Sequence, residues 1–290
     1  MNRPFVSVVV SSYNRPRLIR DAIDSILEQE GMDGLEIIVA DDWSDAGTLR
    51  VLSEYTQRAA NAGVKLWVIA VGSAPPTNQE RQFGGRCAMG INAAAFHVPH
   101  HHGGGHFLAY VPDDDWLPQG SLACRAQYLV DHPDVNVVYG RLESCIGPAE
   151  PGRHVADERQ ECEHDRNGFW SAEPIMRAAN KVDHSMVMVR RVLRLPKWPV
   201  RPTAEMLDDA GKVIGEAQRG RSLGAEIWVP SDPTNGPYVD RIDEQFLCPD
   251  AGWLFRLERA GLGPFHSIDQ VVTVKRYHQH GHQSDPTVRE

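Results

Sequence analysis

Residues 5–16 read FVSVVVSSYNRP, in which an apolar, β-branched run at 5–10 is followed at once by polar residues. Such a run is typical of a strand that is buried on both faces of a parallel sheet and that ends at a functional loop. Residues 16–29, PRLIRDAIDSILEQ, place their apolar side chains on one helical stripe, with a proline that the first turn tolerates. We therefore expect the chain to begin with a strand and a helix.

The same alternation continues along the first half of the chain. Residues 35–42, LEIIVADD, predict a second strand, residues 46–62 a helix, and residues 65–71, KLWVIAV, a third strand. A further helix at 81–97 leads into HFLAYVPDDDWLP at 106–118, where a strand again runs into acidic residues. This pattern predicts an α/β fold with a mostly parallel, Rossmann-like sheet flanked by helices, in which ligands bind at the carboxyl ends of the strands.

The second half of the chain is less regular. It contains an apolar segment at 184–189, a predicted helix at 245–260 and a predicted strand at 271–278. The Gly- and Pro-containing region 196–240 has no assignable elements. At 290 residues, the chain suits one compact α/β unit with one continuous core.

Composition restricts the class of protein. No window approaches the roughly 18 consecutive apolar residues of a membrane span, and the N-terminus lacks the pattern of a signal peptide, so we expect a soluble protein. Five widely spaced cysteines without a CxxC pair indicate reduced thiols and a cytoplasmic location. A formal net charge of −9 argues against a nucleic-acid partner.

The strongest chemical feature is the run of aspartates at 113–115. Adjacent carboxylates repel one another unless a cation or a hydrogen-bonded ligand neutralises them. Mg²⁺ and Mn²⁺ prefer oxygen ligands and bridge carboxylates to substrate phosphates. An acidic loop or a helix N-terminus is the alternative, but the position directly after an apolar strand favours a divalent cation.

A second acidic pair, Asp41 and Asp42, follows the second predicted strand. A carboxylate there could accept the imide N–H of a uracil. The alternative is a loop whose acids cap the next helix. Because two predicted strands of one sheet end in acids, the sequence favours a ligand site at this edge.

Three segments resemble the nucleotide-sugar motifs of glycosyltransferase family 2, in the same order: VSVVVSSYNRP, EIIVADDWSDAGT and FLAYVPDDDWLP. Later segments are also similar to that family: RCAMGINAA at 86–94, NKVDHSMVMVRR at 180–191, PDAGWLFRLERAG at 249–261 and VKRYHQHGHQS at 274–284. The resemblance covers nearly the whole chain apart from about 141–179 and 196–240. Cys87 stands where the family has Asn, Pro112 where the first Asp of its third motif is often found, and Pro249 where Glu usually precedes the base.

The resemblance implies an inverting, metal-dependent glycosyltransferase of GT-A fold, with a nucleotide-sugar-binding half at 1–118 and an acceptor-binding and catalytic-base half at 119–290. The donor would be a nucleotide sugar, with UDP as the nucleotide, and the acceptor a glycan, a lipid-linked sugar or a small molecule. Region 196–240 is then either an acceptor-binding insertion or a surface elaboration. Nucleotide binding is implied for Ser11, Tyr13, Arg15, Asp41, Asp42, Arg86, Asp113 and Asp114.

The same resemblance implies roles for later residues. Asp250 would be the catalytic base, because inversion needs a carboxylate opposite the leaving diphosphate. Mn²⁺ or Mg²⁺ would be held by Asp113, Asp115 and His278. The donor sugar or the acceptor would meet His184, Trp116 and Trp253, and the diphosphate would meet Arg276.

Several alternatives stay open. Asp250 is alternatively a helix cap, and Asp243 and Glu244 are then candidates for the base. Lys275 shares the diphosphate role with Arg276, His280 and His282 can substitute for His278, and Trp116 and Trp253 are alternatively core residues. A sugar-nucleotide pyrophosphorylase would show a Gly-rich loop where this chain has SSYNRP, and a non-catalytic sugar-nucleotide-binding module would not need the acidic run together with Asp250.

Overall fold

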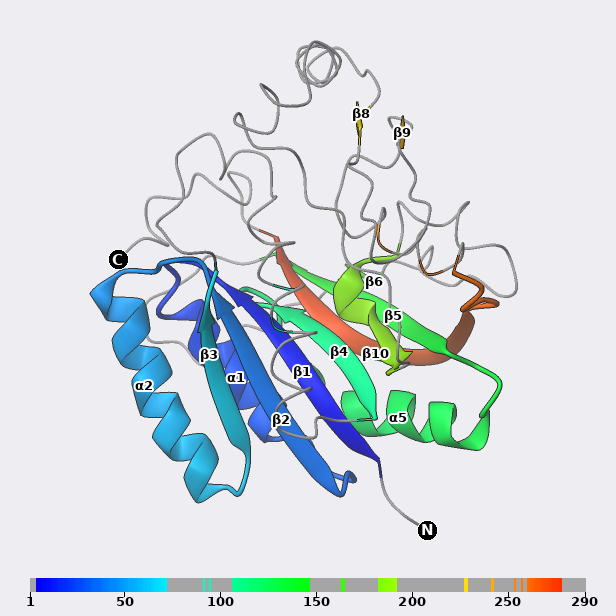
Figure 1. The fold of residues 1–290 in the computed structure, drawn as a ribbon, viewed down its shortest axis with the longest axis horizontal. Helices are drawn as coiled ribbons and strands as arrows, with labels where there is room; N and C mark the ends of the chain where they lie inside the picture. The colour runs from blue at the N-terminus through cyan, green and yellow to red at the C-terminus, as the bar shows by residue number, and fades with distance from the viewer. Residues whose placement is uncertain are drawn as a thin grey trace.

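The computed structural model describes residues 4–71, 91, 94, 106–146, 163–164, 182–191, 227–228, 241–242, 253, 257 and 260–277. Within this part of the chain the first five elements follow the predicted alternation (Figure 1). They are β1 (Phe5–Ser12), α1 (Leu18–Leu27), β2 (Gly34–Asp41), α2 (Ala46–Asn61) and β3 (Lys65–Ala70). Each lies within two residues of its predicted limits, so the prediction of these elements is confirmed.

The later elements complete the main sheet. They are β4 (Phe107–Pro112), α5 (Ser121–Asp131), β5 (Val137–Ile146), β6 (Glu163–His164), the 3-10 helix η3 (His184–Met186), β7 (Val187–Arg190) and β10 (His266–Tyr277). Two further short strands, β8 (Ile227–Trp228) and β9 (Arg241–Ile242), pair with each other. Most of the predicted helices 81–97 and 245–260 and of region 196–240 lies outside the described residues.

Among the described residues, the main sheet has eight strands in the order β10-β5-β7-β4-β1-β2-β3, with β6 paired to β5. β1 runs parallel to both β2 and β4. β2 is also parallel to β3, and β5 is parallel to β10. β7 lies between β4 and β5 and runs antiparallel to both. The sheet is therefore mixed and mostly parallel, as the predicted α/β fold requires.

Apolar side chains cover both faces of the sheet. Val8 and Val10 of β1 pack into one cluster with the apolar residues of α1, α2 and α5, whereas Val9 packs into the cluster on the opposite face. Trp253 and Leu257 are helical and lie in the same cluster as Val9. Burial on both faces explains why β1 is a continuous apolar run rather than an alternating one.

β10 begins five residues before the predicted start at 271. Its pairing with β5 starts at His266, and the register shifts between Ser267 and Thr273. Gly140 lies opposite this irregularity, where a Cβ atom would come within 2.4 Å of Val272 Cγ1 and 2.7 Å of the Gln270 carbonyl oxygen. The polar residues at the bulge hide the start of the strand in the sequence pattern.

Candidate active site at the carboxyl ends of the parallel strands

The loops that follow β1, β2 and β4 meet at one edge of the sheet. Ser11 of β1 is in register with Ala40 of β2 and with Pro112 of β4. The backbone N–H of Asp113 donates to the carbonyl of Ser11 at 3.1 Å, and that of Asp42 donates to the carbonyl of Ser12 at 2.9 Å. The parallel pairing of β1 with β2 and β4 thus brings together the polar or acidic motifs that follow these three strands.

Direct hydrogen bonds join the first loop to the acidic run. The backbone N–H of Tyr13 donates to Asp113 Oδ2 at 3.0 Å. Nη1 of Arg15 donates to Asp113 Oδ1 at 2.8 Å and to Asp114 Oδ2 at 2.7 Å. Arg15 therefore offsets the charge of two carboxylates that lie 98 and 99 positions away in the sequence.

The aspartates of this run are buried, with 4%, 7% and 2% of Asp113, Asp114 and Asp115 exposed. Burial raises the pKa of Asp113 to about 7, and the charge of Asp114 adds to this effect while Arg15 opposes it. Burial likewise raises the pKa of Asp115 well above its usual range, assisted by Asp114 and Asp183. Burial, more than repulsion between the carboxylates, therefore disfavours the charged form of both side chains.

Asp115 differs from its neighbours in its partners. Its Oδ1 accepts a hydrogen bond of 3.3 Å from the backbone N–H of Arg276. Its Oδ2 is buried, and among the described residues it has no hydrogen-bond partner. A buried carboxylate oxygen without a donor is costly, and a bound cation would remove that cost.

The loops after β1 and β2 are joined to each other by hydrogen bonds. Asn14 donates its backbone N–H to Ser44 Oγ at 3.0 Å, and its Oδ1 accepts from the backbone N–H of Asp45 at 2.7 Å. Ser44 in turn donates its backbone N–H to Asp41 Oδ2 at 3.0 Å. Asp45 caps α2 through the backbone N–H of Thr48, at 2.9 Å. The capping acid is thus Asp45, which leaves Asp41 and the half-buried Asp42 at the edge of the sheet.

Trp43 is a residue of this loop that the sequence interpretation missed. Its φ of 57° lies in the left-handed region, where non-glycine residues are uncommon. Its Nε1 donates to the carbonyl of Val71, just after β3, at 2.8 Å, and 38% of the residue stays exposed. The signal available in the sequence was a large aromatic residue directly after two acids.

Lys275 and Arg276 are consecutive residues of β10, so their side chains point to opposite faces of the strand. Arg276 is 3% exposed, pairs with Asp21 of α1 at 3.1 Å and lies over the ring of Trp116 at 5.3 Å. Lys275 instead forms an ion pair with Asp183. Both residues are candidates for binding the diphosphate. Arg276 packs against α1, whereas Lys275 extends toward the turn that precedes β7.

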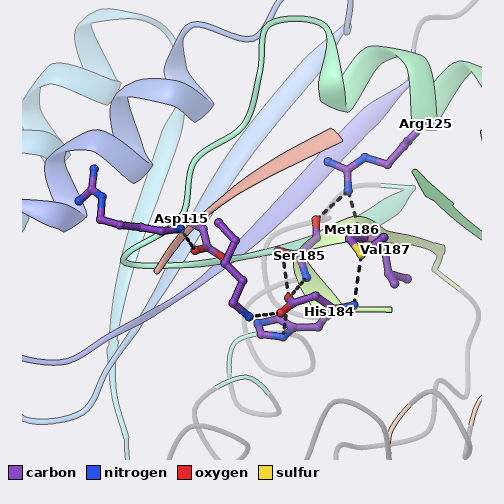
Figure 2. A network of polar contacts seen from close by, with 9 residues as sticks. Asp115, Arg125, His184, Ser185, Met186 and Val187 are labelled. Carbon is purple, nitrogen blue, oxygen red and sulfur yellow. Dashed lines mark hydrogen bonds and ion pairs between the residues drawn. The ribbon is translucent and has the colours of Figure 1, made fainter. Parts of the chain in front are cut away.

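Asp183 is a second residue that the sequence interpretation missed. Its Oδ1 accepts 2.9 Å hydrogen bonds from the backbone and the hydroxyl of Ser185 and lies 3.3 Å from His184 Nδ1 (Figure 2). Although burial alone would raise it, the charges of His184 and Lys275 hold the pKa of Asp183 well below its usual range. An acid directly before the His-Ser pair of the 180–191 segment was the signal in the sequence.

The remaining predicted site residues divide into two groups. Trp116 and Trp253 are 2% and 1% exposed, so the structure places both in the core, the alternative that the sequence left open. Arg86, Asp250 and His278 lie outside the described residues.

A metal site was also predicted. In the part of the chain that the structure describes, no group of three His, Cys, Asp or Glu side chains is arranged to hold a metal ion. Asp113 has both oxygens engaged by Tyr13 and Arg15, whereas the buried Oδ2 of Asp115 has no hydrogen-bond partner among the described residues. The described residues thus fit a cation held by Asp115 together with phosphate oxygens, since Mg²⁺ is commonly bound by one or two carboxylates plus substrate phosphates.

None of the helices in the described part of the chain is both long enough and apolar enough to span a bilayer.

Comparison with known proteins adds to these observations. Residues 7–70 match the family model for Glycosyl transferase family 2. Protein CgeD of Bacillus subtilis (strain 168) is 27% identical over 277 residues, which cover 85% of this chain and 58% of CgeD. This chain thus spans less than two thirds of the length of that relative.

Solved structures show the same fold. A crystal structure of S. aureus TarS 1–349 has a TM-score of 0.53 and 16% identity, and the likeness covers 95% of this chain and 60% of that one. The structure of TarS 1–349 in complex with UDP-GlcNAc has a TM-score of 0.51 and 15% identity, covering 96% and 59%. With the strand order of the sheet, these likenesses show that the chain has a GT-A fold, and its residues 7–70 match the model of glycosyltransferase family 2.

Proposed function

We propose that this chain is an inverting glycosyltransferase that moves a sugar from a nucleoside diphosphate sugar, with UDP as the nucleotide, to a hydroxyl group of an acceptor. The observation that carries the proposal is the joining of three strand-end loops through Tyr13, Arg15 and Asp113. Residues 1–118 would bind the donor, and residues 119–290 would supply the acceptor site and the base. The cytoplasmic location belongs to the same proposal.

The nucleoside would lie over the loops after β1 and β2. Ser11, Tyr13 and the pair Asp41 and Asp42 border this edge, and a carboxylate can accept the imide N–H of a uracil. The exposed part of Trp43 offers a flat surface on which the base can stack. Arg86 is proposed as a further contact on the basis of the family resemblance alone.

The diphosphate would lie between Asp115 and Lys275. A divalent cation, Mn²⁺ or Mg²⁺, would supply Lewis-acid stabilisation of the charge that develops on the leaving diphosphate. Asp115 would hold that cation through Oδ2, which accepts no hydrogen bond from the described residues, with His278 as a further ligand. Lys275 carries a positive charge next to Asp183 and would pair with the phosphate oxygens.

The acceptor would approach from the second half of the chain. His184 is mostly buried beside Asp183 and would contact the donor sugar or the acceptor. Asp250 is proposed as the base that takes the proton of the acceptor hydroxyl, since the carboxylate must lie within hydrogen-bond reach of that group.

The first experiment measures donor binding. Isothermal titration of the full chain with UDP, UDP-GlcNAc, GDP and uridine is performed with and without MnCl₂; UDP-GlcNAc is included because TarS has been crystallised with it. We expect UDP and its sugar to bind more tightly with Mn²⁺. Absence of binding of every nucleoside diphosphate would refute the proposal.

A second experiment tests the base. Asp250→Asn should lower sugar transfer by about 10²–10⁴-fold, the usual contribution of general-base catalysis, while the affinity for UDP is retained. Asp243→Asn and Glu244→Gln serve as matched controls, because these acids are the alternative candidates. If Asp250→Asn transfers sugar at the normal rate and a control variant does not, the role of base moves to that control residue.

A further inference from the structure

Arg125 of α5 is a buried cation that the proposed mechanism does not use. The residue is 0% exposed. Burial lowers the pKa of its guanidinium to about 10, so the group is still protonated at neutral pH. In the described part of the chain no carboxylate pairs with it. A buried charge without a counter-ion is costly, so the groups that do bind it need an explanation.

The acceptors of Arg125 are main-chain carbonyls, two of which are drawn in Figure 2, and the hydroxyl of Ser121. Nη1 donates to the carbonyls of Ser185 and Val187, at 3.2 and 3.4 Å. Nε donates to the carbonyl of Ser121 at 3.1 Å, and Nη2 to its hydroxyl at 2.8 Å. The guanidinium thus fastens the first turn of α5 to η3 and to the start of β7.

The same turn of α5 is also fastened to β10. The hydroxyl of Ser121 donates to the carbonyl of Val272 at 2.5 Å. Val272 lies three positions before Lys275, whereas Ser185 lies two positions after Asp183. Arg125 and Ser121 therefore tie together the two backbone segments that carry the ion pair of Asp183 with Lys275.

We propose that Arg125 is a positioning residue that holds the Asp183–Lys275 pair beside Asp115, so that the ammonium of Lys275 faces the diphosphate of the donor. The inference rests on the proposed function, because the diphosphate is the ligand that Lys275 would meet. Arg125 acts through the main chain of η3 and does not contact the ligand. A planar group with several fixed donors suits this task, since it can bind carbonyls of two segments at once.

The test compares UDP with uridine, because the two ligands differ only in the diphosphate. In Arg125→Met we expect the affinity for UDP to fall about tenfold, the value of one charge-assisted hydrogen bond. The affinity for uridine should stay within about twofold of the wild type, since Arg125 donates its hydrogen bonds to Ser121, Ser185 and Val187 rather than to the loops after β1 and β2. Leu129→Ala in the same helix is the control: it removes buried apolar volume and should weaken UDP and uridine equally or not at all.

A double-mutant cycle with Lys275→Met separates positioning from general destabilisation. If Arg125 acts through Lys275, the two substitutions together should weaken UDP no more than Lys275→Met alone. Additive losses, or an unchanged UDP-to-uridine ratio in Arg125→Met, would overturn the inference. If Arg125→Met does not fold, Ser121→Ala takes its place. In that variant the ratio of UDP affinity to uridine affinity should fall about threefold, and an unchanged ratio would overturn the inference.

Different results would refute the proposed function and the role of Arg125. A wild-type protein that binds neither UDP nor uridine refutes the proposed function. A wild-type protein that prefers UDP, with the same preference in Arg125→Met, leaves the proposed function intact and refutes the role of Arg125.

Discussion

Replacing Arg15 by Met tests whether this guanidinium compensates the acidic run. Its Nη1 lies 2.8 Å from Asp113 and 2.7 Å from Asp114, whose side chains are 6% and 7% exposed. Removing one partner of a buried ion pair costs about 3–5 kcal/mol, because it leaves a buried charge without compensation. At about 2–4 °C per kcal/mol for a domain of this size, the melting temperature should fall by roughly 6–20 °C.

Arg20→Met is a matched control. Arg20 pairs with Glu54 at the same distance, 2.8 Å, but the two side chains are 43% and 51% exposed. Exposed pairs contribute at most about 1 kcal/mol, so this variant should melt within a few degrees of the wild type. The comparison keeps the N–O distance constant and changes burial.

Thermal unfolding followed by circular dichroism in metal-free buffer measures both variants. Adding MnCl₂ should raise the melting temperature of Arg15→Met more than that of the wild type, because a cation replaces the lost charge. The triple variant Arg15→Met with Asp113→Asn and Asp114→Asn should recover much of the stability. If Arg15→Met melts within about 2 °C of the wild type, Arg15 does not balance the acidic run.

Three further predictions concern single residues. Asp115→Asn should raise the metal-free melting temperature, because it removes a buried carboxylate without a full set of donors, and should abolish the Mn²⁺-dependent gain in UDP affinity in the titration. Trp43→Ala should weaken UDP by about 5–150-fold, the usual range for stacking of one base, and reduce the UDP-induced change in tryptophan fluorescence; an unchanged dissociation constant would place the base elsewhere. Gly140→Ala should destabilise the fold by about 1–3 kcal/mol in thermal melts, since its Cβ would overlap Val272, and an unaltered melting temperature would show that β10 can move away.

Much of the half that we propose to bind the nucleotide could be predicted from the sequence. The strands β1 to β3 and the helices between them follow from periodicity that each segment carries by itself. The position of Asp41 and of Asp113–Asp115 at one edge follows as well, because the carboxyl ends of parallel strands meet. Region 196–240 carries no such periodicity, and its proposed roles remain predictions.

Local patterns determined which elements form here, since a residue's tendency to lie in a strand or helix depends on near neighbours in the chain. Only the tertiary structure decided that β7 runs antiparallel between β4 and β5, and that Lys275 rather than Arg276 faces Asp183. It also decided that Arg15 meets Asp113 and Asp114. These outcomes depend on contacts between segments tens to hundreds of positions apart, and on which side of β10 each residue takes, so they arise only when the chain is folded.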